Sequence, residues 1–217
     1  TGARNRGAST SRRNRVVEIN RRPDGDWDVV TEQGTVTCEH VVNAAGCYAD
    51  RVARMVGLRV PMANALHAYL VTEPVPEIAA LDTELPVVRD DYLSGYIRQE
   101  QESGLIGIYE QVGAESAWHD HPAWELENPL FPIDYDIIGD RLLRAFECMP
   151  CLEPRGIKQT IRGAITHTPD GEAMLGHSGV PNFWMACGAQ VGVADGPGLG
   201  RELARWMVHG ETQLSVR

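Results

Sequence analysis

The stretch CEHVVNAAGCYAD, residues 38–50, decides the fold. The apolar pair Val41 and Val42 is typical of the end of a strand, and a helix is expected to open at Tyr48, just after four small residues. Small side chains let a ligand approach the backbone closely, and a helix N-terminus favours negative charge. The pattern therefore predicts either a ligand-binding turn between strand and helix or a tight turn with nothing bound.

The composition is that of a globular protein with one large domain or two modest ones. The 217 residues are 43% hydrophobic and 23% charged, which is ordinary for such a protein. No apolar run approaches the ~20 residues of a membrane span and no signal peptide opens the chain, so we expect a cytoplasmic protein without membrane contact. The net charge of −10 argues against nucleic-acid binding, and the arginine-rich residues 1–22 are interpreted as solvated surface.

Cysteine and histidine spacings favour neither a disulfide framework nor a metal centre. Five cysteines are an odd count for paired bridges. Cys148 and Cys151 form a CxxC, but this motif follows a helical pattern instead of opening a helix, so a structural turn is preferred to a redox or metal site. His119 and His121 can share one ion only on an extended strand, and no third ligand stands at a recognisable spacing. We therefore predict no metal site.

Alternating and helical patterns predict a chain rich in strands. Three antiparallel strands are expected in the first third, at 15–19, 27–31 and 35–42. The last of them delivers the small residues, and a helix over 48–56 then ends at Gly57. Further strands are expected at 67–72, 87–89, 92–99, 105–109, 157–166 and 183–187. A loop over 112–135 and helices over 136–147 and 199–209 complete the prediction.

Four phrases, in this order, resemble one enzyme family. They are VVNAAGCYAD (41–50), HAYLVTEPVPEI (67–78), YIRQEQESGLIGIYE (96–110) and ITHTPDGEAMLG (165–176). Together they resemble the dimethylglycine and sarcosine dehydrogenase branch of the D-amino-acid-oxidase-like FAD-dependent oxidoreductases. The resemblance implies a mixed α/β fold with two parts. Residues 1–60 and 156–217 would form an incomplete, Rossmann-like FAD-binding region, and residues 61–155 an antiparallel substrate-binding sheet.

The resemblance also implies which residues approach the FAD. Val16 would meet the adenine through its backbone, and a small-residue turn would lie beside the dinucleotide; the turn consists of Asn43, Ala44, Ala45 and Gly46. A second group would approach the isoalloxazine ring, namely Gly171, Leu175 and Gly176. A third would bring backbone N–H groups at a helix N-terminus toward the flavin N1–C2=O edge, and it comprises Gly188, Gln190, Val191, Gly192 and Val193.

By the same resemblance, the reaction is the oxidation of a secondary or tertiary amine, such as an N-methylated glycine, by hydride transfer to flavin. His67 resembles the active-site histidine of this branch and would accept the amine proton. Tyr96 would point its hydroxyl into the same pocket, and Arg98 would anchor the substrate carboxylate. Hydrogen bonding within the sheet for His67, and ordinary packing or a surface ion pair for the other two, stay open as alternatives.

One expected motif is missing from the sequence. Family members begin with a βαβ unit carrying GxGxxG, and the nearest pattern here, Gly196-Pro-Gly198-Leu-Gly200, has the wrong spacing. We therefore expect the later part of a flavoprotein catalytic region, for which FAD binding by this chain alone is in question. Apolar faces without a partner would then favour a homo-oligomer or a complementing chain. The alternative is a truncated, catalytically silent fragment that acts only in assembly.

Overall fold

The computed structural model describes residues 2–110 and 115–215, which form two compact units. The first unit comprises Thr1–Met62 and Thr168–Arg217, and the second comprises Ala63–His167. The sequence placed the second boundary at 155/156, but the structure places it at 167/168. The reason is that β9 (Ile157–His167) pairs along its whole length with β5 (Ala63–Thr72), so both strands belong to one sheet.

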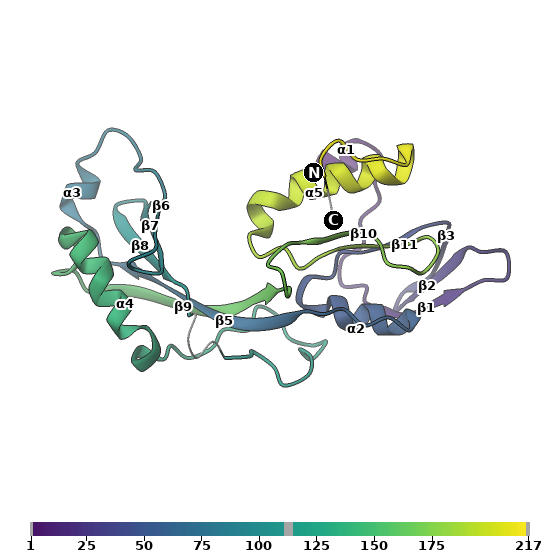
Figure 1. The fold of residues 1–217 in the computed structure, drawn as a ribbon, viewed down its shortest axis with the longest axis horizontal. Coiled ribbons are helices and arrows are strands. Elements are labelled where there is room, and N and C mark those ends of the chain that lie inside the picture. The colour runs from purple at the N-terminus through teal and green to yellow at the C-terminus, as the bar shows by residue number, and fades with distance from the viewer. Residues whose placement is uncertain (1, 111–114, 216–217) are drawn as a thin grey trace. The chain divides into compact units, whose positions relative to one another are not determined.

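Two small sheets and a helical layer on each side build the first unit (Figure 1). Its elements are α1 (Gly2–Asn5), β1 (Val16–Arg21), β2 (Trp27–Thr31), β3 (Gly34–Cys38), β4 (Val41–Asn43), η1 (Gly46–Tyr48), α2 (Ala49–Ala53), η2 (Arg54–Val56), β10 (Met174–His177), β11 (Phe183–Cys187) and α5 (Gly192–His209). One sheet is the antiparallel meander β1-β2-β3. The other has the order β10-β11-β4, in which β11 and β4 run parallel.

The expected single strand over 35–42 is wrong. The chain breaks at residues 39–40 into β3 and β4, which lie in different sheets. Cys38 ends the pairing with Trp27, whereas Val41 starts a new ladder beside Phe183. The small-residue turn therefore follows a short parallel strand and not the meander. A helical run over 46–56 comes next, made of η1, α2 and η2, and it ends at Gly57 as predicted.

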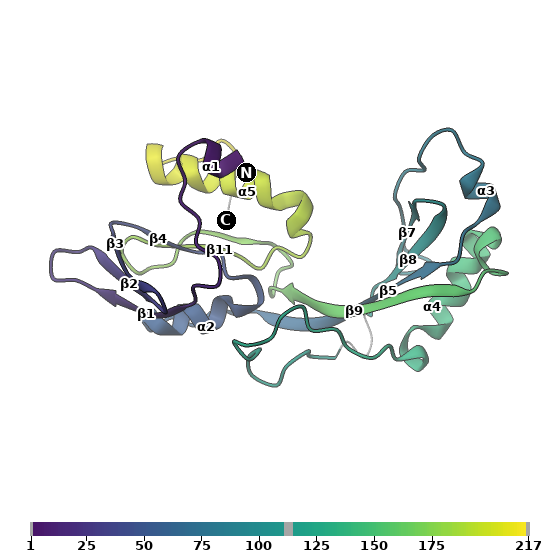
Figure 2. The same cartoon turned by 180° about the vertical axis from the view of Figure 1, so that it is seen from behind.

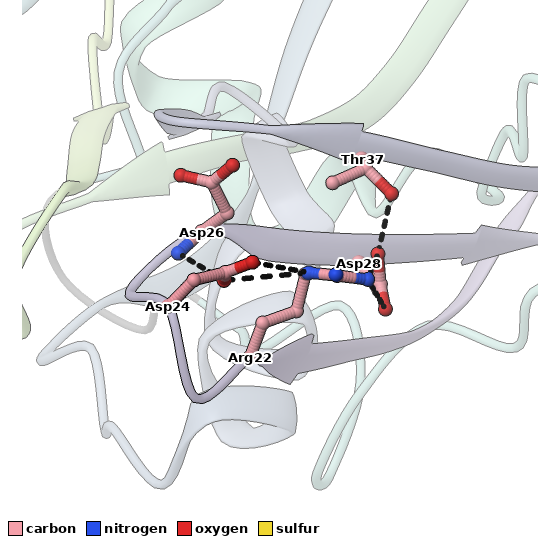
Figure 3. Close-up of polar contacts among 5 residues, drawn as sticks. All are labelled: Arg22, Asp24, Asp26, Asp28 and Thr37. Atoms are coloured by element: carbon pink, nitrogen blue, oxygen red, sulfur yellow. Dashed lines mark hydrogen bonds and ion pairs between the residues drawn. The ribbon is translucent and has the colours of Figure 1, made fainter.

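An exposed polar network joins the three strands of the meander (Figure 3). Arg22 pairs with Asp24 at 3.2 Å and with Asp28 at 3.3 Å, and the Thr37 hydroxyl donates to Asp28 at 2.6 Å. In the turn, the Asp26 N–H donates to Asp24 at 3.2 Å. Because these side chains are solvated, their ion pairs contribute little to stability, and buried packing holds the unit together.

The core of the first unit lies between the meander, the second sheet and α2. The rings of Trp27 and Phe183 pack with centroids 5.9 Å apart, and Ala49 and Ala53 of α2 are completely buried against them. On the other face of β10 and β11, α5 covers a smaller apolar cluster through Leu203 (Figure 1).

A five-stranded antiparallel sheet with α4 packed on one face forms the second unit (Figure 2). The strand order is β6-β7-β8-β5-β9. The elements added here are α3 (Pro76–Ala79), β6 (Val88–Asp90), β7 (Gly95–Glu100), β8 (Ser103–Ile108), α4 (Tyr135–Cys148) and η3 (Pro150–Leu152). Leu70, Ile97, Ile106 and Ile108 of the sheet pack with Ile138 of α4 in the core. α4 confirms the helix predicted over 136–147.

Several expected boundaries change. β7 begins at Gly95 and not at residue 92, and β10 and α3 were not predicted. α5 begins at Gly192, seven residues before the predicted start, and continues through glycines and Pro197, which have low helix propensity. Of the loop predicted over 112–135, residues 112–114 lie outside the described part of the chain.

Asp50 is a buried carboxylate that fixes the segment after α2. It accepts hydrogen bonds from the Val60 N–H at 2.7 Å and from Arg54 Nε at 2.9 Å. Burial acts to raise the pKa of Asp50, but the Val60 N–H and the Arg54 charge outweigh burial and hold the pKa below its usual value. Asp50 therefore stabilises the fold in its ionised form, and this contribution is lost as the pH falls through its lowered pKa.

We predict that Asp50→Ala lowers the free energy of unfolding by about 2 kcal/mol, because the buried Val60 N–H loses its acceptor. Chemical denaturation at pH 7 measures the change. Asp24→Ala is the matched control, since its ion pair is exposed and its loss should cost much less. Equal effects of the two substitutions would contradict the structural role of Asp50.

Candidate functional site

The small-residue turn is held by the side chain of its first residue. Asn43 is buried; its Nδ2 donates to the Ala49 carbonyl at 2.8 Å, and its Oδ1 accepts from the Ala45 N–H at 3.2 Å. These bonds tie the end of β4 to the start of the helical run. The Asn43 side chain thus has a structural partner at each end, which leaves the backbone of the turn as the part that can meet a ligand.

The middle of the turn is open. Ala44 and Gly46 are exposed, and a Cβ added to Gly46 would meet nothing within 4 Å. Gly46 also has a φ of 55°, so glycine is favoured there by conformation as well as by access. Val16 is half-buried at the start of β1 and packs beside the core of the first unit.

Three residues expected near the isoalloxazine ring or the flavin edge have packing roles inside the first unit. A Cβ on Gly176 would lie 2.2 Å from the Trp206 ring, and one on Gly188 would lie 2.5 Å from Thr168 Cγ2. Leu175 is buried in the apolar cluster beneath α5. The absence of a side chain at the two glycines is therefore required by the fold, whatever is bound nearby. Their predicted roles toward the cofactor stay predictions.

The segment leading into α5 is exposed, in contrast to the glycines that precede it. Gln190, Val191, Gly192 and Val193 are all exposed, and Val193 is fully so. Val191 stands at the N-cap without a capping side-chain hydrogen bond. The first turn of a helix carries N–H groups with no partner inside the helix and a partial positive charge. Such a helix start favours a negatively charged group. Gly171, at a φ of 78°, lies in an exposed turn before β10.

In the second unit, the sheet turns an aromatic cluster away from α4. The cluster consists of His67 on β5, Tyr96 on β7 and Tyr109 just after β8. His67 lies 6.1 Å from Tyr96 and 5.3 Å from Tyr109 between ring centroids, and the two tyrosines are 5.8 Å apart. Ala68 and Ile97, their chain neighbours, point into the core under α4. The structure thus brings His67 and Tyr96 together on one face.

Gly107 makes room for the cluster. It lies opposite Tyr96 in the β7–β8 register, and a Cβ there would be 2.1 Å from Tyr96 Cζ. The Tyr96 ring consequently lies flat across β8 and reaches Tyr109. Neither Gly107 nor Tyr109 was predicted as a site residue, although both stand in the quoted phrase over 96–110, and the period of two along β8 was the signal that could have found them.

The two arginines on this side of the sheet have different surroundings. Arg98 pairs with Glu100 at 2.5 Å and donates to the Gln99 carbonyl at 3.0 Å, beside a pocket of about 310 Å³. Arg89 on β6 pairs across the strands with Tyr96, and its Cζ lies 5.3 Å from the centre of the Tyr109 ring. The sequence analysis named Arg98 and did not name Arg89, and the predicted role of Arg98 stays a prediction.

Burial sets the protonation of the aromatic cluster. It lowers the pKa of His67 to about 4; a hydrogen bond to the backbone of Ile108 opposes this shift and the charge of His167 adds to it. Burial also raises the pKa of Tyr96. At neutral pH the cluster therefore presents a neutral imidazole and a neutral phenol. In a neutral imidazole one ring nitrogen is a donor and the other is an acceptor.

The histidine and cysteine motifs form no metal site in the described residues. His121 Nε2 lies 3.2 Å from Asp120 Oδ1, and no group of three or more His, Cys, Asp or Glu side chains is arranged to hold an ion there. Cys148 ends α4, and burial, with the nearby Asp90 and Glu147, raises its pKa. A raised pKa disfavours the reactive thiolate. Across residues 2–110 and 115–215, no helix is both long and apolar enough to cross a membrane.

The family described as FAD dependent oxidoreductase matches residues 1–206. The chain belongs to this family. Dimethylglycine dehydrogenase, mitochondrial, of Mus musculus is 41% identical over 99% of this chain, and sarcosine dehydrogenase, mitochondrial, of Mus musculus is 35% identical over 87% of it. The chain spans 25% and 20% of the lengths of these relatives.

Solved structures agree with this family at the level of the fold. The crystal structure of L-proline dehydrogenase from P. horikoshii matches with a TM-score of 0.79 and 22% identity, over 99% of this chain and 54% of that one. FAD is the cofactor of the family, and the residues expected to approach it stay predictions. The predicted mixed α/β fold and the resemblance to the dimethylglycine and sarcosine dehydrogenases are confirmed.

We predict that Gly107→Ala destabilises the chain by about 1–3 kcal/mol, because the new methyl group forces the Tyr96 ring away from β8. Gly163→Ala is the matched control: Gly163 lies opposite His67 in the same sheet, and a Cβ there meets nothing within 4 Å. Denaturation curves measure stability, and contacts between tyrosine ring protons in NMR spectra measure the aromatic cluster. Intact Tyr96–Tyr109 contacts in Gly107→Ala would contradict the packing described here.

We predict that the His67 imidazole titrates near pH 4. An unfolded histidine titrates near 6.5, so the unfolded chain binds the proton more tightly and stability falls as the pH drops from about 6.5 toward 4. Between pH 7.5 and 5, His67 should account for about 2 kcal/mol of lost stability. Denaturation of wild type and His67→Gln at both pH values isolates this contribution, and an equal loss in the two proteins would refute it.

Proposed function

We infer that this chain is part of an FAD-dependent oxidoreductase that oxidises a secondary or tertiary amine, such as an N-methylated glycine. The observation that carries the proposal is the aromatic cluster, in which a neutral histidine lies against two tyrosines on a face that α4 does not cover. The similarity to dimethylglycine and sarcosine dehydrogenases supports the same class of substrate.

In this proposal the aromatic cluster binds and orients the amine. A methylated ammonium group is attracted to the faces of aromatic rings, and in this proposal Tyr96 offers such a face on the side away from Gly107. The acceptor nitrogen of the His67 ring accepts a hydrogen bond from the N–H of the amine. Because its pKa is lowered to about 4, the imidazole is unprotonated at neutral pH and does not repel the cationic substrate. Tyr96, whose pKa is raised, keeps its hydroxyl proton and can donate a hydrogen bond.

FAD, when bound, would supply the acceptor for the hydride that leaves the carbon beside the nitrogen, once the amine has released its N–H proton to water through the His67 imidazole. The residues proposed to hold it are the open backbone of residues 43–46 and the exposed segment 190–193 at the start of α5. There, N–H groups of the first helical turn would stabilise negative charge. Gly176 and Gly188 have an indirect role in this proposal. They let Trp206 and Thr168 pack closely, and this packing holds the first unit together around the two segments.

The second candidate function is a catalytically silent chain that acts in assembly with another copy or a complementing chain. The observation in its favour is α5, whose first seven residues are all exposed and include Val193 with a completely exposed side chain. Most helical stability in proteins comes from tertiary packing, so a glycine-rich helix start that the described chain leaves uncovered favours a partner. The cytoplasmic location expected from the sequence stays a prediction, and the names of the two mammalian relatives place those proteins in mitochondria.

We predict that the purified chain, mixed with FAD and then desalted, retains the visible flavin absorption bands. Anaerobic addition of N,N-dimethylglycine should then bleach the band of oxidised flavin. In His67→Gln the bands should persist, because this residue belongs to the second unit, while bleaching slows on the order of 100-fold.

Complete loss of flavin on desalting would contradict cofactor binding by this chain alone and favour the assembly role. In that case, analytical ultracentrifugation of the chain distinguishes self-association from a monomer that requires a different partner. Retained flavin that no N-methylated amine bleaches would contradict the proposed substrate class.

A further inference from the structure

The strand that carries Arg89 brings a guanidinium to the aromatic cluster. Arg89 stands opposite Tyr96 in the β6–β7 ladder, and its Cζ lies 5.3 Å from the centre of the Tyr109 ring. The same Tyr109 ring stacks on His67 with centroids 5.3 Å apart and an interplanar angle of 24°. One tyrosine is thus in contact with both the cation and the imidazole.

Within the described part of the second unit, Arg89 differs from the other arginines in having no polar partner. Arg98 is paired with Glu100, and Arg162 is held by the buried Glu110 at 3.0 Å. Arg144 also lies over a tyrosine, Tyr92, but it donates to that residue's carbonyl at 3.0 Å. Among the described residues, the only interaction of the Arg89 guanidinium is the contact with the Tyr109 ring.

This arrangement suits an anion. A guanidinium stacked on an aromatic face is held in place while its N–H edge remains free, and that edge matches a carboxylate in a bidentate geometry. Arg98 would first have to release Glu100 and the Gln99 carbonyl before it could take a substrate carboxylate. Among the described residues Arg89 has no such partner to release, so only water must leave its guanidinium. A hydrogen bond from Arg89 to a carboxylate therefore costs less free energy to form than one from Arg98.

We propose that Arg89, and not Arg98, recognises the carboxylate of the substrate whose amine lies on the aromatic cluster. The substrate class is then an amino acid with its carboxylate close to the amine, and a plain alkylamine is excluded from good binding. This assignment rests on the proposed function, because it takes the aromatic cluster as the site of the amine. Arg89 is a specificity residue, with His67 and Tyr96 in the roles already given.

The test measures binding to the full chain by NMR, without flavin. Two probes share the same amine: N,N-dimethylglycine, which has a carboxylate, and 2-(dimethylamino)ethanol, which has a hydroxyl in its place. Shifts of the His67 and Tyr109 ring resonances report binding of each probe. Wild type should bind dimethylglycine roughly 10- to 100-fold more tightly than the alcohol, the ratio that charged hydrogen bonds provide.

Arg89→Met removes the charge and keeps an apolar stem, so the two probes should bind it equally. Arg89→Lys keeps the charge without the bidentate geometry and should show an intermediate preference. Arg144→Met is the matched control, because it removes a cation of the same kind from a different tyrosine, and it should keep the full preference. Arg98→Met tests the competing anchor directly.

A carboxylate preference that persists in Arg89→Met, or that disappears in Arg98→Met instead, overturns the assignment of Arg89. Equal binding of the two probes to wild type would also overturn the assignment of Arg89. Binding of the amine by the aromatic cluster would still be supported in that case. If neither probe shifts the rings of wild type at millimolar concentration, the proposed amine function fails and the assignment of Arg89 fails with it.

Discussion

The register of β5, β7 and β8 is the constraint on which the candidate site depends. Ala68 pairs with Ile108, and Tyr96 pairs with Gly107, so the pleat sends His67, Tyr96 and Tyr109 to the same face. A slip of one residue in β7 would move Tyr96 into the core under α4 and bring Ile97 to the outer face. The same core that buries Ile97 and Ile108 therefore fixes the positions of the aromatic rings.

One charged pair breaks the apolar pattern of the core face. Arg162 on β9 and Glu110 are both buried, and the guanidinium also donates to the Pro132 carbonyl at 3.1 Å. The Arg162 carbonyl accepts from the Phe131 N–H at 2.8 Å. A buried ion pair often gains little net stability, because desolvation offsets its attraction. Its effect here is positional: it holds both the residue after Tyr109 and the chain that returns toward α4 against β9.

The sequence predicted the strands of the second unit well, because each carries a period of two between turn residues, and it brought His67 and Tyr96 to one pocket by resemblance. The period of two along β8 could place Gly107 and Tyr109 on one face, but it could not show that Gly107 lies beneath Tyr96, since contact between residues of neighbouring strands depends on the register. The sequence analysis also merged β3 with β4, because the polar break at residues 39–40 is short and both flanks are apolar. The packing reason for Gly176 could not be predicted either: the Trp206 ring requires a glycine there, through a contact across thirty residues that local spacing does not reveal.

At the start of α5, the binding of an anion and the stability of the helix are coupled. Four glycines lie within the helix, each disfavoured by about 1 kcal/mol relative to alanine, and Pro197 adds a further cost. The seven residues from Gly192 onward are exposed, so packing within the described chain offsets little of that cost. An anion bound at the first turn stabilises the helical form over any other, and by linkage whatever orders this helix tightens anion binding by the same factor. A chain segment that covered the exposed side of α5 would therefore raise the affinity for an anion at the first turn without contacting the anion itself.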